Sequence, residues 1–312
     1  MRALVTGGAG FIGSNVVDAL LARGNEVAVV DDLSTGRIEN LEEALAAGVT
    51  FHQLDIREAD AVTAAFESIR PELVFHLAAQ VDVRRAIADP AFDASVNVVG
   101  TINVLEAAQA SGARRLINTS TGGAIYGETE VMPTPETVVP APVSAYGQSK
   151  QCAELYCAWA SRARGLETVT LRYGNVYGPR QDPAGESGVI AIFIGHMLSG
   201  RRPTVFGDGS AVRDYTFVSD VVAANLLAAN ASGLTGCMNI GTGVGSSLLD
   251  VIDAISDVAG FNGMIKPHFL PSRPGEINRS SLDVTLAREE LGFSAEVGLR
   301  EGIRATIAGL RP

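Results

Sequence analysis

Residues 6–13 of this chain read Thr6-Gly7-Gly8-Ala9-Gly10-Phe11-Ile12-Gly13, and this stretch decides the fold. It follows an apolar run, Ala3–Thr6, that predicts a strand, and it opens an amphipathic run, Ser14–Arg23, that predicts a helix. Its glycines have the spacing GxxGxxG. Glycine at these places permits a tight turn and lets the backbone touch a pyrophosphate, which the helix N-terminus then stabilises. A glycine-rich structural turn is the alternative for the motif alone, but the strand before it and the helix after it favour a dinucleotide-binding turn.

An acidic residue at the end of the next predicted strand supports this interpretation. Asp31 closes the apolar run Glu26–Asp31 and lies 31 − 13 = 18 residues past Gly13, close to the roughly 20 expected for a carboxylate on adenosine ribose hydroxyls. A helix cap or a solvated turn acid is the alternative for this residue. No Arg follows immediately to hold a 2′-phosphate, since the next is Arg37, and this favours NAD over NADP.

Short β-branched runs alternate with longer amphipathic runs through the first half of the chain, which predicts right-handed βαβ units. The further predicted strands are Val49–Leu54, Leu73–Leu77, Arg115–Thr119 and Thr168–Tyr173, and the further predicted helices are Asp60–Ile69, Phe92–Ala110 and Ala145–Arg164. We therefore expect an α/β fold with a doubly wound parallel sheet of the Rossmann type over residues 1–174, with room for later segments to return to it.

The pattern changes after about residue 175, where Gly and Pro interrupt it more often. Short strands alternate there with shorter helices. We expect residues 175–312 to form a smaller, mostly C-terminal α+β lobe. Its predicted helices are Val189–Leu198, Val221–Ala229, Leu248–Val258 and Val284–Leu291.

Charge and composition exclude several classes of partner. The chain has 35 acidic residues and 24 Lys plus Arg, a net charge of −11, which argues against binding nucleic acid or an anionic membrane. It has no run of 18 apolar residues, and its start resembles a strand entering a turn rather than a signal peptide. Cys152, Cys157 and Cys237 form neither a disulfide framework nor a CxxC metal site, which suits a cytoplasmic location.

The stretch Tyr146-Gly-Gln-Ser-Lys150 carries the candidate chemistry. Its i, i+4 spacing on a predicted helix places the phenol and the amine on one face. A phenol has a pKa near ~10, and a base working at pH 7 needs about 3 units less, or roughly 4 kcal/mol. The Lys150 ammonium and a cationic nicotinamide can supply this together by favouring the phenolate. A surface Tyr–Lys pair is the alternative, but the pair follows a predicted strand and a polar loop, at the sheet edge where such folds bind ligands.

Three other residues and one group of hydroxyls have two interpretations each. Asp55 accepts a hydrogen bond from the adenine amino group or caps the next helix. Asn97 is a satisfied core amide or a group that orders the catalytic Lys and the cofactor. His76, in a buried strand, is expected to be a packed neutral imidazole rather than a metal ligand. The hydroxyls of residues 119–121 bond a substrate oxygen or cap the strand end.

The chain as a whole resembles the extended short-chain dehydrogenase/reductases, and within them most closely the UDP-sugar 4-epimerases. The resemblance covers roughly residues 1–305. GxxGxxG and YxxxK mark the superfamily, whereas RDYTFV and RPGE are more specific because they come from the lobe that grips nucleotide sugars in this family. The stretches that carry it are GGAGFIG (7–13), DDLSTG (31–36), HLAAQVDVRR (76–85), VNVVGTINVLEAA (96–108), TGGAIYG (121–127), YGQSK (146–150), LRYGNVYGPRQ (171–181), VFGDG (205–209), RDYTFVSD (213–220) and RPGE (273–276).

The resemblance implies a role for each matching residue. Tyr146 is the base, and Lys150 binds the nicotinamide ribose and lowers the pKa of the phenol. NAD is held by Gly7, Gly10, Phe11, Ile12, Gly13, Asp31, Asp32, Ser34, Thr35, Gly36, Asp55, Ile56, Leu77, Ala78, Ala79, Gln80 and Asn97 together with that pair. The UDP phosphates are held by Asn175, Arg213 and Arg273, and uridine lies near Val189, Thr204, Val205 and Phe206.

The sequence departs from the family pattern at one catalytic position. Many relatives have Ser or Thr four residues before the Tyr of the xYG segment, and here that position is Gly122. We expect Thr121 to assist Tyr146 instead, with Ser120 or an ordered water as alternatives. Glycines at 122 and 123 also disfavour a 4,6-dehydratase, whose relatives carry Asp-Glu there.

The resemblance implies an NAD-dependent epimerase that inverts C4 of a UDP-hexose through a transient 4-keto sugar. Asp182 stands where relatives acting on UDP-glucuronate often carry an Arg, which favours UDP-glucose and UDP-galactose. The pair UDP-glucuronate/UDP-galacturonate stays open, because Arg84, Arg85 and Arg180 could pair a carboxylate. The N-acetylated sugars stay open as substrates. A non-catalytic NAD-binding protein is the alternative to an enzyme. The family habit of pairing through a four-helix bundle implies a homodimer through Phe92–Ala110 and Ala145–Arg164.

Overall fold

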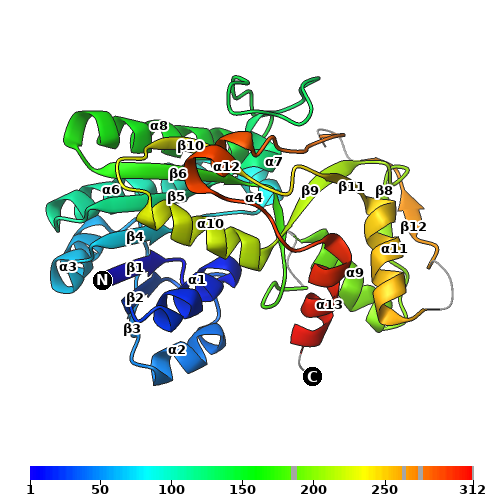
Figure 1. Cartoon of the computed structure of the whole chain (residues 1–312), viewed down its shortest axis with the longest axis horizontal. Coiled ribbons are helices and arrows are strands. Elements are labelled where there is room, and N and C mark those ends of the chain that lie inside the picture. The colour runs from blue at the N-terminus through cyan, green and yellow to red at the C-terminus, as the bar shows by residue number, and fades with distance from the viewer. Residues whose placement is uncertain (184–187, 262–264, 273–276, 311–312) are drawn as a thin grey trace.

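The computed structural model describes residues 1–183, 188–261, 265–272 and 277–310, and its centre is a seven-stranded parallel sheet (Figure 1). The strands lie in the order β10-β6-β5-β4-β1-β2-β3. The predicted α/β doubly wound sheet is confirmed, and six of its strands fall on the predicted runs. The strands are β1 (Arg2–Thr6), β2 (Glu26–Asp31), β3 (Thr50–Gln53), β4 (Leu73–His76), β5 (Arg115–Thr121), β6 (Glu167–Tyr173) and β10 (Gly236–Ile240).

Apolar side chains cover both faces of this sheet, as expected for parallel strands. Neighbouring residues of one strand belong to different clusters: Val5 packs with the cluster that includes α1 (Phe11–Ala22) and α10 (Val218–Asn230), and Leu4 packs with the other. That second cluster includes side chains of α3 (Ala59–Ile69), α6 (Thr101–Ala110) and α8 (Ala145–Arg164).

The strand order reverses between β1 and β4, and this reversal positions the site. The chain runs from β1 outward to β2 and β3, then crosses back to β4 on the other side of β1. The loops after β1 and β4 therefore diverge at the carboxyl edge, which is where doubly wound sheets bind ligands.

The predicted helix Phe92–Ala110 differs in detail from the structure. It begins two residues earlier as α5 (Pro90–Ala94), because Asp89 caps it by accepting a hydrogen bond from the Phe92 amide at 2.9 Å. A π-helical segment, Ser95–Gly100, then joins α5 to α6.

Figure 1 shows α9, α11 and α13 grouped together beside one end of the sheet, whereas α12 lies against β10 of the sheet itself. A three-stranded sheet has the order β11-β9-β7, and β8 pairs with β12. Strand β10 joins the main sheet by pairing with β6. These elements are β7 (Asn175–Tyr177), β8 (Thr204–Phe206), β9 (Val212–Phe217), β11 (Gly245–Ser247), β12 (His268–Leu270), α9 (Val189–Leu198), α11 (Leu248–Ala259), α12 (Thr285–Leu291) and α13 (Leu299–Gly309).

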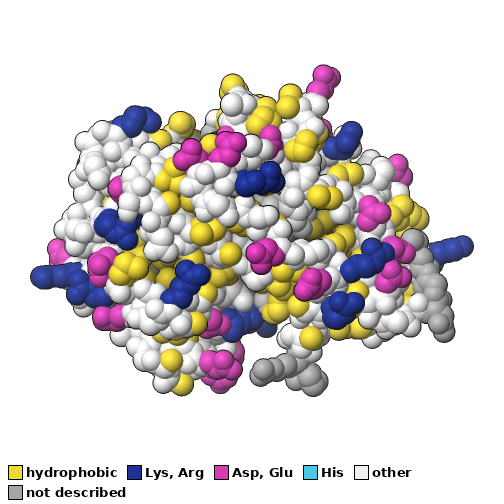
Figure 2. Space-filling model, viewed as in Figure 1, with side chains coloured by type: hydrophobic (Ala, Val, Ile, Leu, Met, Phe, Trp, Pro, Cys, Tyr) yellow, Lys and Arg dark blue, Asp and Glu magenta, His cyan; other side chains and the backbone are white. Residues whose placement is uncertain are grey.

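Short helices complete the described chain, namely α2 (Glu42–Ala46), which follows a 3-10 turn, α4 (Val83–Ala88) and α7 (Gly122–Ile125). None of the helices in the described part of the chain is long and apolar enough to cross a membrane. Basic side chains are interspersed with acidic ones on the face shown in Figure 2.

Candidate active site

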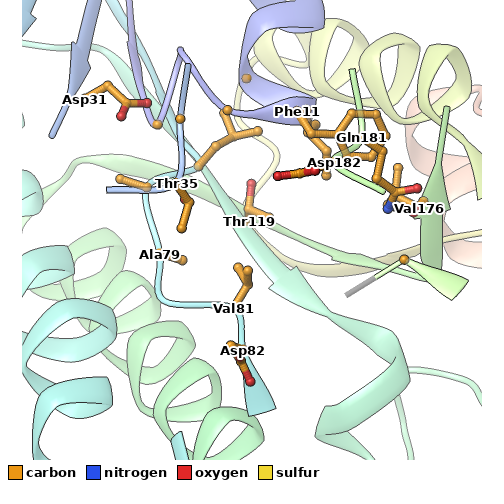
Figure 3. A pocket seen from close by; sticks show the side chains of 18 of the residues that line it. Phe11, Asp31, Thr35, Ala79, Val81, Asp82, Thr119, Val176, Gln181 and Asp182 are labelled. Carbon is orange, nitrogen blue, oxygen red and sulfur yellow. Dashed lines mark hydrogen bonds between the residues drawn. The ribbon is translucent and has the colours of Figure 1, made fainter. Parts of the chain in front are cut away.

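A cavity of about 920 Å³ lies at the carboxyl edge of the main sheet. The glycine-rich turn after β1 and the loops after β2, β4 and β5 line it, together with the start of α8 and residues 173–177, 180–182 and 188–190. In Figure 3, Asp31 and Thr35 lie on one side of this space, whereas Gln181 and Asp182 lie near Phe11. The dinucleotide turn and the Tyr–Lys pair, which are 133 residues apart in sequence (146 − 13 = 133), thus share one cavity.

The glycine-rich turn admits no larger residues at its key positions. Gly7 has φ +70°, and a Cβ there would lie 2.6 Å from the Ala78 amide nitrogen. A Cβ on Gly13 would collide with the Gly7 carbonyl oxygen. The glycines therefore let the turn pack closely against the loop after β4. The backbone of the turn, which carries no side chains at these glycines, faces the cavity. This arrangement suits a bound pyrophosphate.

Asp31 is buried at the end of β2 and braces this turn. Its carboxylate accepts hydrogen bonds from the Ala9 amide at 2.9 Å and the Leu33 amide at 2.8 Å. Burial raises the pKa of Asp31 above its usual range, while those two amides act in the opposite direction. Asp31 is thus neither a helix cap nor a solvated acid, and it lines the cavity.

Asp55 also lines the cavity, and its partner is Arg57. The guanidinium donates to Asp55 at 2.8 Å, and this hydrogen bond holds the pKa of the carboxyl below its usual range. Helix α3 is preceded by Glu58, so the alternative in which Asp55 caps that helix is wrong.

The Tyr–Lys pair comes from the first turns of α8. Ser144 begins this helix by accepting a hydrogen bond from the Gly147 amide at 3.1 Å. Burial lowers the pKa of Lys150 to about 8, and burial raises the pKa of Tyr146 to about 12, with a further rise from Asp93. The phenol is therefore protonated at neutral pH in this protein by itself, and it needs added positive charge to ionise.

The loop after β5 explains the departure at Gly122. A Cβ on Gly122 would lie 2.5 Å from a methyl carbon of Leu282, which is itself buried. The hydroxyl that meets the phenol comes instead from Thr121, whose interaction lowers the pKa of Tyr146. Thr121 also caps α7 by accepting from the Ala124 amide at 3.2 Å. Ser120 lines the cavity as well, and its buried hydroxyl has no partner among the described residues.

Two predicted cofactor residues, Gln80 and Asn97, lie behind the cavity lining rather than in it. The side-chain amide of Asn97 accepts a hydrogen bond from the backbone N–H of Gln80 at 2.9 Å and donates one to the Ser149 hydroxyl at 3.0 Å. The Gln80 side chain donates to the Asp82 carbonyl and to Asp93. Both interpretations of Asn97 stay open, because its side-chain amide is satisfied in the core and also bonds Ser149, the residue before Lys150.

His76 is a packed neutral imidazole, as expected. Its nitrogens bond the hydroxyls of Thr6 at 2.7 Å and Thr101 at 2.9 Å. Burial lowers the pKa of His76 to about 3. No cluster of His, Cys, Asp or Glu with metal-binding geometry occurs in the described residues.

The predicted nucleotide-sugar residues divide into two groups. Asn175 and Val189 line the cavity. Arg213 does not line it, and its guanidinium donates to the Val212 carbonyl at 2.9 Å. The strand Thr204–Phe206 does not line it either. Arg273 lies outside the described residues.

Sequence reasoning missed two lining residues that form an ion pair. Arg37 donates to Asp182 at 2.8 Å, which joins the loop after β2 to the loop after β7. The sequence drew attention to Asp182, which follows the GPRQ stretch, but nothing there identified Arg37 as its partner 145 residues earlier (182 − 37 = 145). A second pair, Arg180 with Asp18 at 2.7 Å, ties the same loop to α1.

The chain is similar to known proteins along its whole length. A model of the NAD dependent epimerase/dehydratase family matches residues 3–241. A UDP-glucose 4-epimerase from Mycolicibacterium smegmatis is 46% identical over 312 residues, which cover 100% of this chain and 99% of that protein. The crystal structure of a UDP-glucose 4-epimerase from Thermotoga maritima with UDP-glucose has a TM-score of 0.94 and 45% identity, and the match covers 99% of this chain and 98% of that chain. A UDP-glucose 4-epimerase from Thermus thermophilus in complex with NAD matches with a TM-score of 0.91, 45% identity and the same coverage.

Proposed function

Because the chain belongs to the NAD-dependent epimerase/dehydratase family, we propose that it inverts C4 of a UDP-hexose through a transient 4-keto sugar, with UDP-glucose and UDP-galactose as the pair. One observation carries the proposal. Tyr146, Lys150 and Thr121 line the same cavity as the dinucleotide turn. A family member that had lost its chemistry would not be expected to keep this set.

The residues of the turn fit NAD. The close approach of Gly7 and Gly13 leaves backbone amides at the start of α1 free to meet phosphates. NAD supplies the hydride acceptor and donor at the nicotinamide ring. We propose that the cavity-lining residues of the predicted set hold it, namely Gly7, Gly10, Phe11, Ile12, Gly13, Asp31, Asp32, Ser34, Thr35, Gly36, Asp55, Ile56, Leu77, Ala78 and Ala79.

Tyr146 moves the proton in this scheme. Its phenolate takes the proton of the 4-hydroxyl as C4 gives up hydride and becomes a ketone, and it returns that proton when hydride is added to the opposite face. Lys150 holds the phenolate form by its charge. Thr121 orients the phenol and the sugar oxygen. The protein is redox-neutral over one turnover, because each electron pair removed from C4 comes back to it.

The cations of the cavity favour a neutral sugar. Among the described residues, the cations that line the cavity are Lys150, Arg37 and Arg180, and both arginines are already paired with carboxylates. The guanidinium of Arg85 lies 4.0 Å from the centre of the Phe92 ring. A sugar 6-carboxylate that bound either lining arginine would have to displace the carboxylate partner of that arginine, and this favours UDP-glucose and UDP-galactose over UDP-glucuronate.

We also propose a homodimer and a cytoplasmic location. Leu155, Tyr156 and Trp159 are large apolar residues exposed on α8, which supports a second copy of the chain on this face. The cysteines at 152, 157 and 237 are all free thiols, as in proteins of reducing compartments.

Separation of sugar nucleotides by chromatography tests the function. Purified protein is incubated side by side with UDP-glucose, UDP-glucuronate and UDP-N-acetylglucosamine. UDP-galactose is expected as the fastest-forming product, and Tyr146→Phe is expected to abolish it while bound NAD is retained. Failure of wild-type protein to form any 4-epimer would refute the proposal, and a faster reaction with the acidic or N-acetylated sugar would correct the substrate.

A further inference from the structure

A buried carboxylate that the proposed chemistry does not use lies close to the Tyr–Lys pair. Asp93 on α5 is 1% exposed, and α5 packs against α8. Its Oδ1 accepts from Gln80 Nε2 at 2.8 Å and from Asn97 Nδ2 at 3.2 Å. Its Oδ2 is buried, and no donor of the described residues reaches it. A carboxylate buried with half of its hydrogen-bonding capacity unused is costly unless a positive charge lies near it.

Lys150 is a buried cation whose pKa the Asp93 charge raises. It is 3% exposed and forms no ion pair with a carboxylate in the described part of the chain. Burial lowers the pKa of Lys150, and three groups raise it: Cys157 and Glu154 from its own helix and Asp93 from α5.

Two of those groups are committed or neutral. Glu154 makes a bidentate pair with Arg172, with N–O distances of 2.9 and 2.6 Å. Burial raises the pKa of the Cys157 thiol to about 12, so this thiol carries no charge at neutral pH. Asp93 is therefore the carboxylate that remains to balance the Lys150 ammonium.

A chain of hydrogen bonds fixes Asp93 relative to the catalytic turn. Asn97 bonds Asp93 and also donates to the Ser149 hydroxyl at 3.0 Å. Ser149 in turn donates to the Tyr146 carbonyl at 3.0 Å. The carboxylate and the start of α8 are thus held in one network, with few degrees of freedom between them.

We propose that Asp93 is the counter-ion of the Lys150 ammonium and that its charge sets the ionisation balance of the Tyr146–Lys150 pair. Asp93 does not line the cavity, so it is a positioning residue that acts through that pair. The inference rests on the proposed function and adds a determinant of the pH range in which the same site works.

The Asp93 charge raises the pKa of both Tyr146 and Lys150, but it stabilises the ionised form of only one of them. A negative charge at position 93 favours the ammonium of Lys150 and opposes the phenolate of Tyr146. The charged groups that act on Tyr146 are Asp93 and, in the proposed chemistry, Lys150, whereas the Thr121 hydroxyl carries no charge. Loss of the Asp93 charge therefore lowers the pKa of both groups, and the active pH range moves to lower pH without becoming narrower.

The test compares Asp93→Asn with Asp89→Asn. Each removes one negative charge from the same segment, but Asp89 is exposed and Asn keeps its cap on the Phe92 amide. In Asp93→Asn, both limbs of the kcat profile are expected to shift to lower pH by about 1 unit. In Asp89→Asn both limbs of the kcat profile are expected to stay at their wild-type pH values. If neither limb of the kcat profile moves in Asp93→Asn, the role of Asp93 is purely structural, even where the rate falls. This result would overturn the proposal.

A thermal-unfolding cycle tests the charge interaction between Asp93 and Lys150 without turnover. Lys150→Met is expected to lower the Tm in wild type and to lower it less in Asp93→Asn, because the variant has no buried charge left unpaired. Equal losses in both backgrounds would overturn the proposal. If Asp93→Asn alone does not fold, a folded Asp93→Asn/Lys150→Met protein supports the pairing and an unfolded one refutes it. Absence of 4-epimerase activity in wild type would refute the proposed function and leave this cycle interpretable.

Discussion

The chemistry at the scale of single residues depends on a phenol whose surroundings oppose its ionisation. Burial and the nearby Asp93 charge raise the pKa of Tyr146 to about 12, and Thr121 recovers only part of this rise. Lys150, with a pKa of about 8, is still an ammonium at neutral pH. A base at that pH requires a much lower value, so the positive charge of oxidised NAD has to supply the rest.

The first prediction concerns this ionisation. Binding of NAD⁺ is expected to lower the apparent pKa of Tyr146 by about 2–3 units, because a cation near the phenol favours the phenolate. Phenolate absorbance is titrated with and without NAD⁺, and the same titration of Tyr146→Phe is subtracted to remove the other tyrosines. In Lys150→Met the value is expected to rise again. An unchanged titration in the presence of NAD⁺ would contradict this account.

The second prediction concerns Gly122. Restoring the common family residue by Gly122→Ser is expected to destabilise the protein by about 1–3 kcal/mol, because the new side chain overpacks against Leu282. Gly123→Ser is the matched control, since the nearest atom to its Cβ is the Asn175 Oδ1 at 3.3 Å. Urea unfolding measures both. Equal stability of the two variants would mean that the loop adjusts and that Leu282 does not exclude a hydroxyl at position 122.

At the scale of elements, helices and strands carry buried polar groups that their neighbours satisfy. The π-helical segment brings Asn97 within reach of Gln80 and Ser149. Strand β4 places His76 between a hydroxyl of β1 and a hydroxyl of α6. Such groups bind strand and helix together only while they stay in one protonation state.

The third prediction follows from His76, whose pKa of about 3 lies below the ordinary 6.5. As pH falls through about 6.5, the unfolded chain takes up a proton that the folded protein refuses, so the stability of the fold decreases. The loss is about 1.4 kcal/mol per pH unit, or roughly 2 kcal/mol at pH 5. His76→Gln is expected to reduce the difference in unfolding free energy between pH 7 and pH 5 by that amount.

Urea unfolding at the two pH values measures this difference. The exposed His268 provides the control, and His268→Gln is expected to leave the difference as it is in wild type. A His76→Gln protein that loses as much stability as wild type between pH 7 and pH 5 would place the acid sensitivity elsewhere.

At the scale of the whole molecule, the site is assembled from the parallel sheet and from the segment that follows β6. The ion pairs Arg37–Asp182 and Arg180–Asp18 join these parts beside the cavity. The opposite end of α8 is left with apolar residues exposed, and Tyr156 and Trp159 pack there edge to face at 6.4 Å between ring centres. Helix α8 therefore connects the catalytic pair to the surface that we propose for a second copy.

The fourth prediction addresses that surface. Leu155→Asp is expected to convert a dimer into monomers, because a charge at the centre of an apolar interface stays unpaired. Sedimentation velocity measures the change. Val139→Asp is the control, since Val139 is even more exposed but lies away from α8, in the segment between α7 and α8. A wild-type protein that sediments as a monomer, or a Leu155→Asp protein that still dimerises, would refute the proposed interface.

Local pattern was enough to predict the sheet, the dinucleotide turn and the Tyr–Lys spacing. Turn glycines, strand-length apolar runs and an i, i+4 pair all act over a few residues, so the order of residues in the chain specifies them directly. The place of the cavity also followed, because the alternation of strands and helices implies a parallel sheet, and the reversal of strand order in such a sheet determines its binding edge.

Contacts between distant segments decided the rest. Two features depend on segments that only folding brings together. Leu282 packs where a side chain on Gly122 would lie, and Arg37 forms an ion pair with Asp182. The same holds for Asp93, which the sequence presents as one more acid in a helical run and the fold buries beside Lys150. Burial and charge proximity are properties of three-dimensional packing, and a linear pattern records neither.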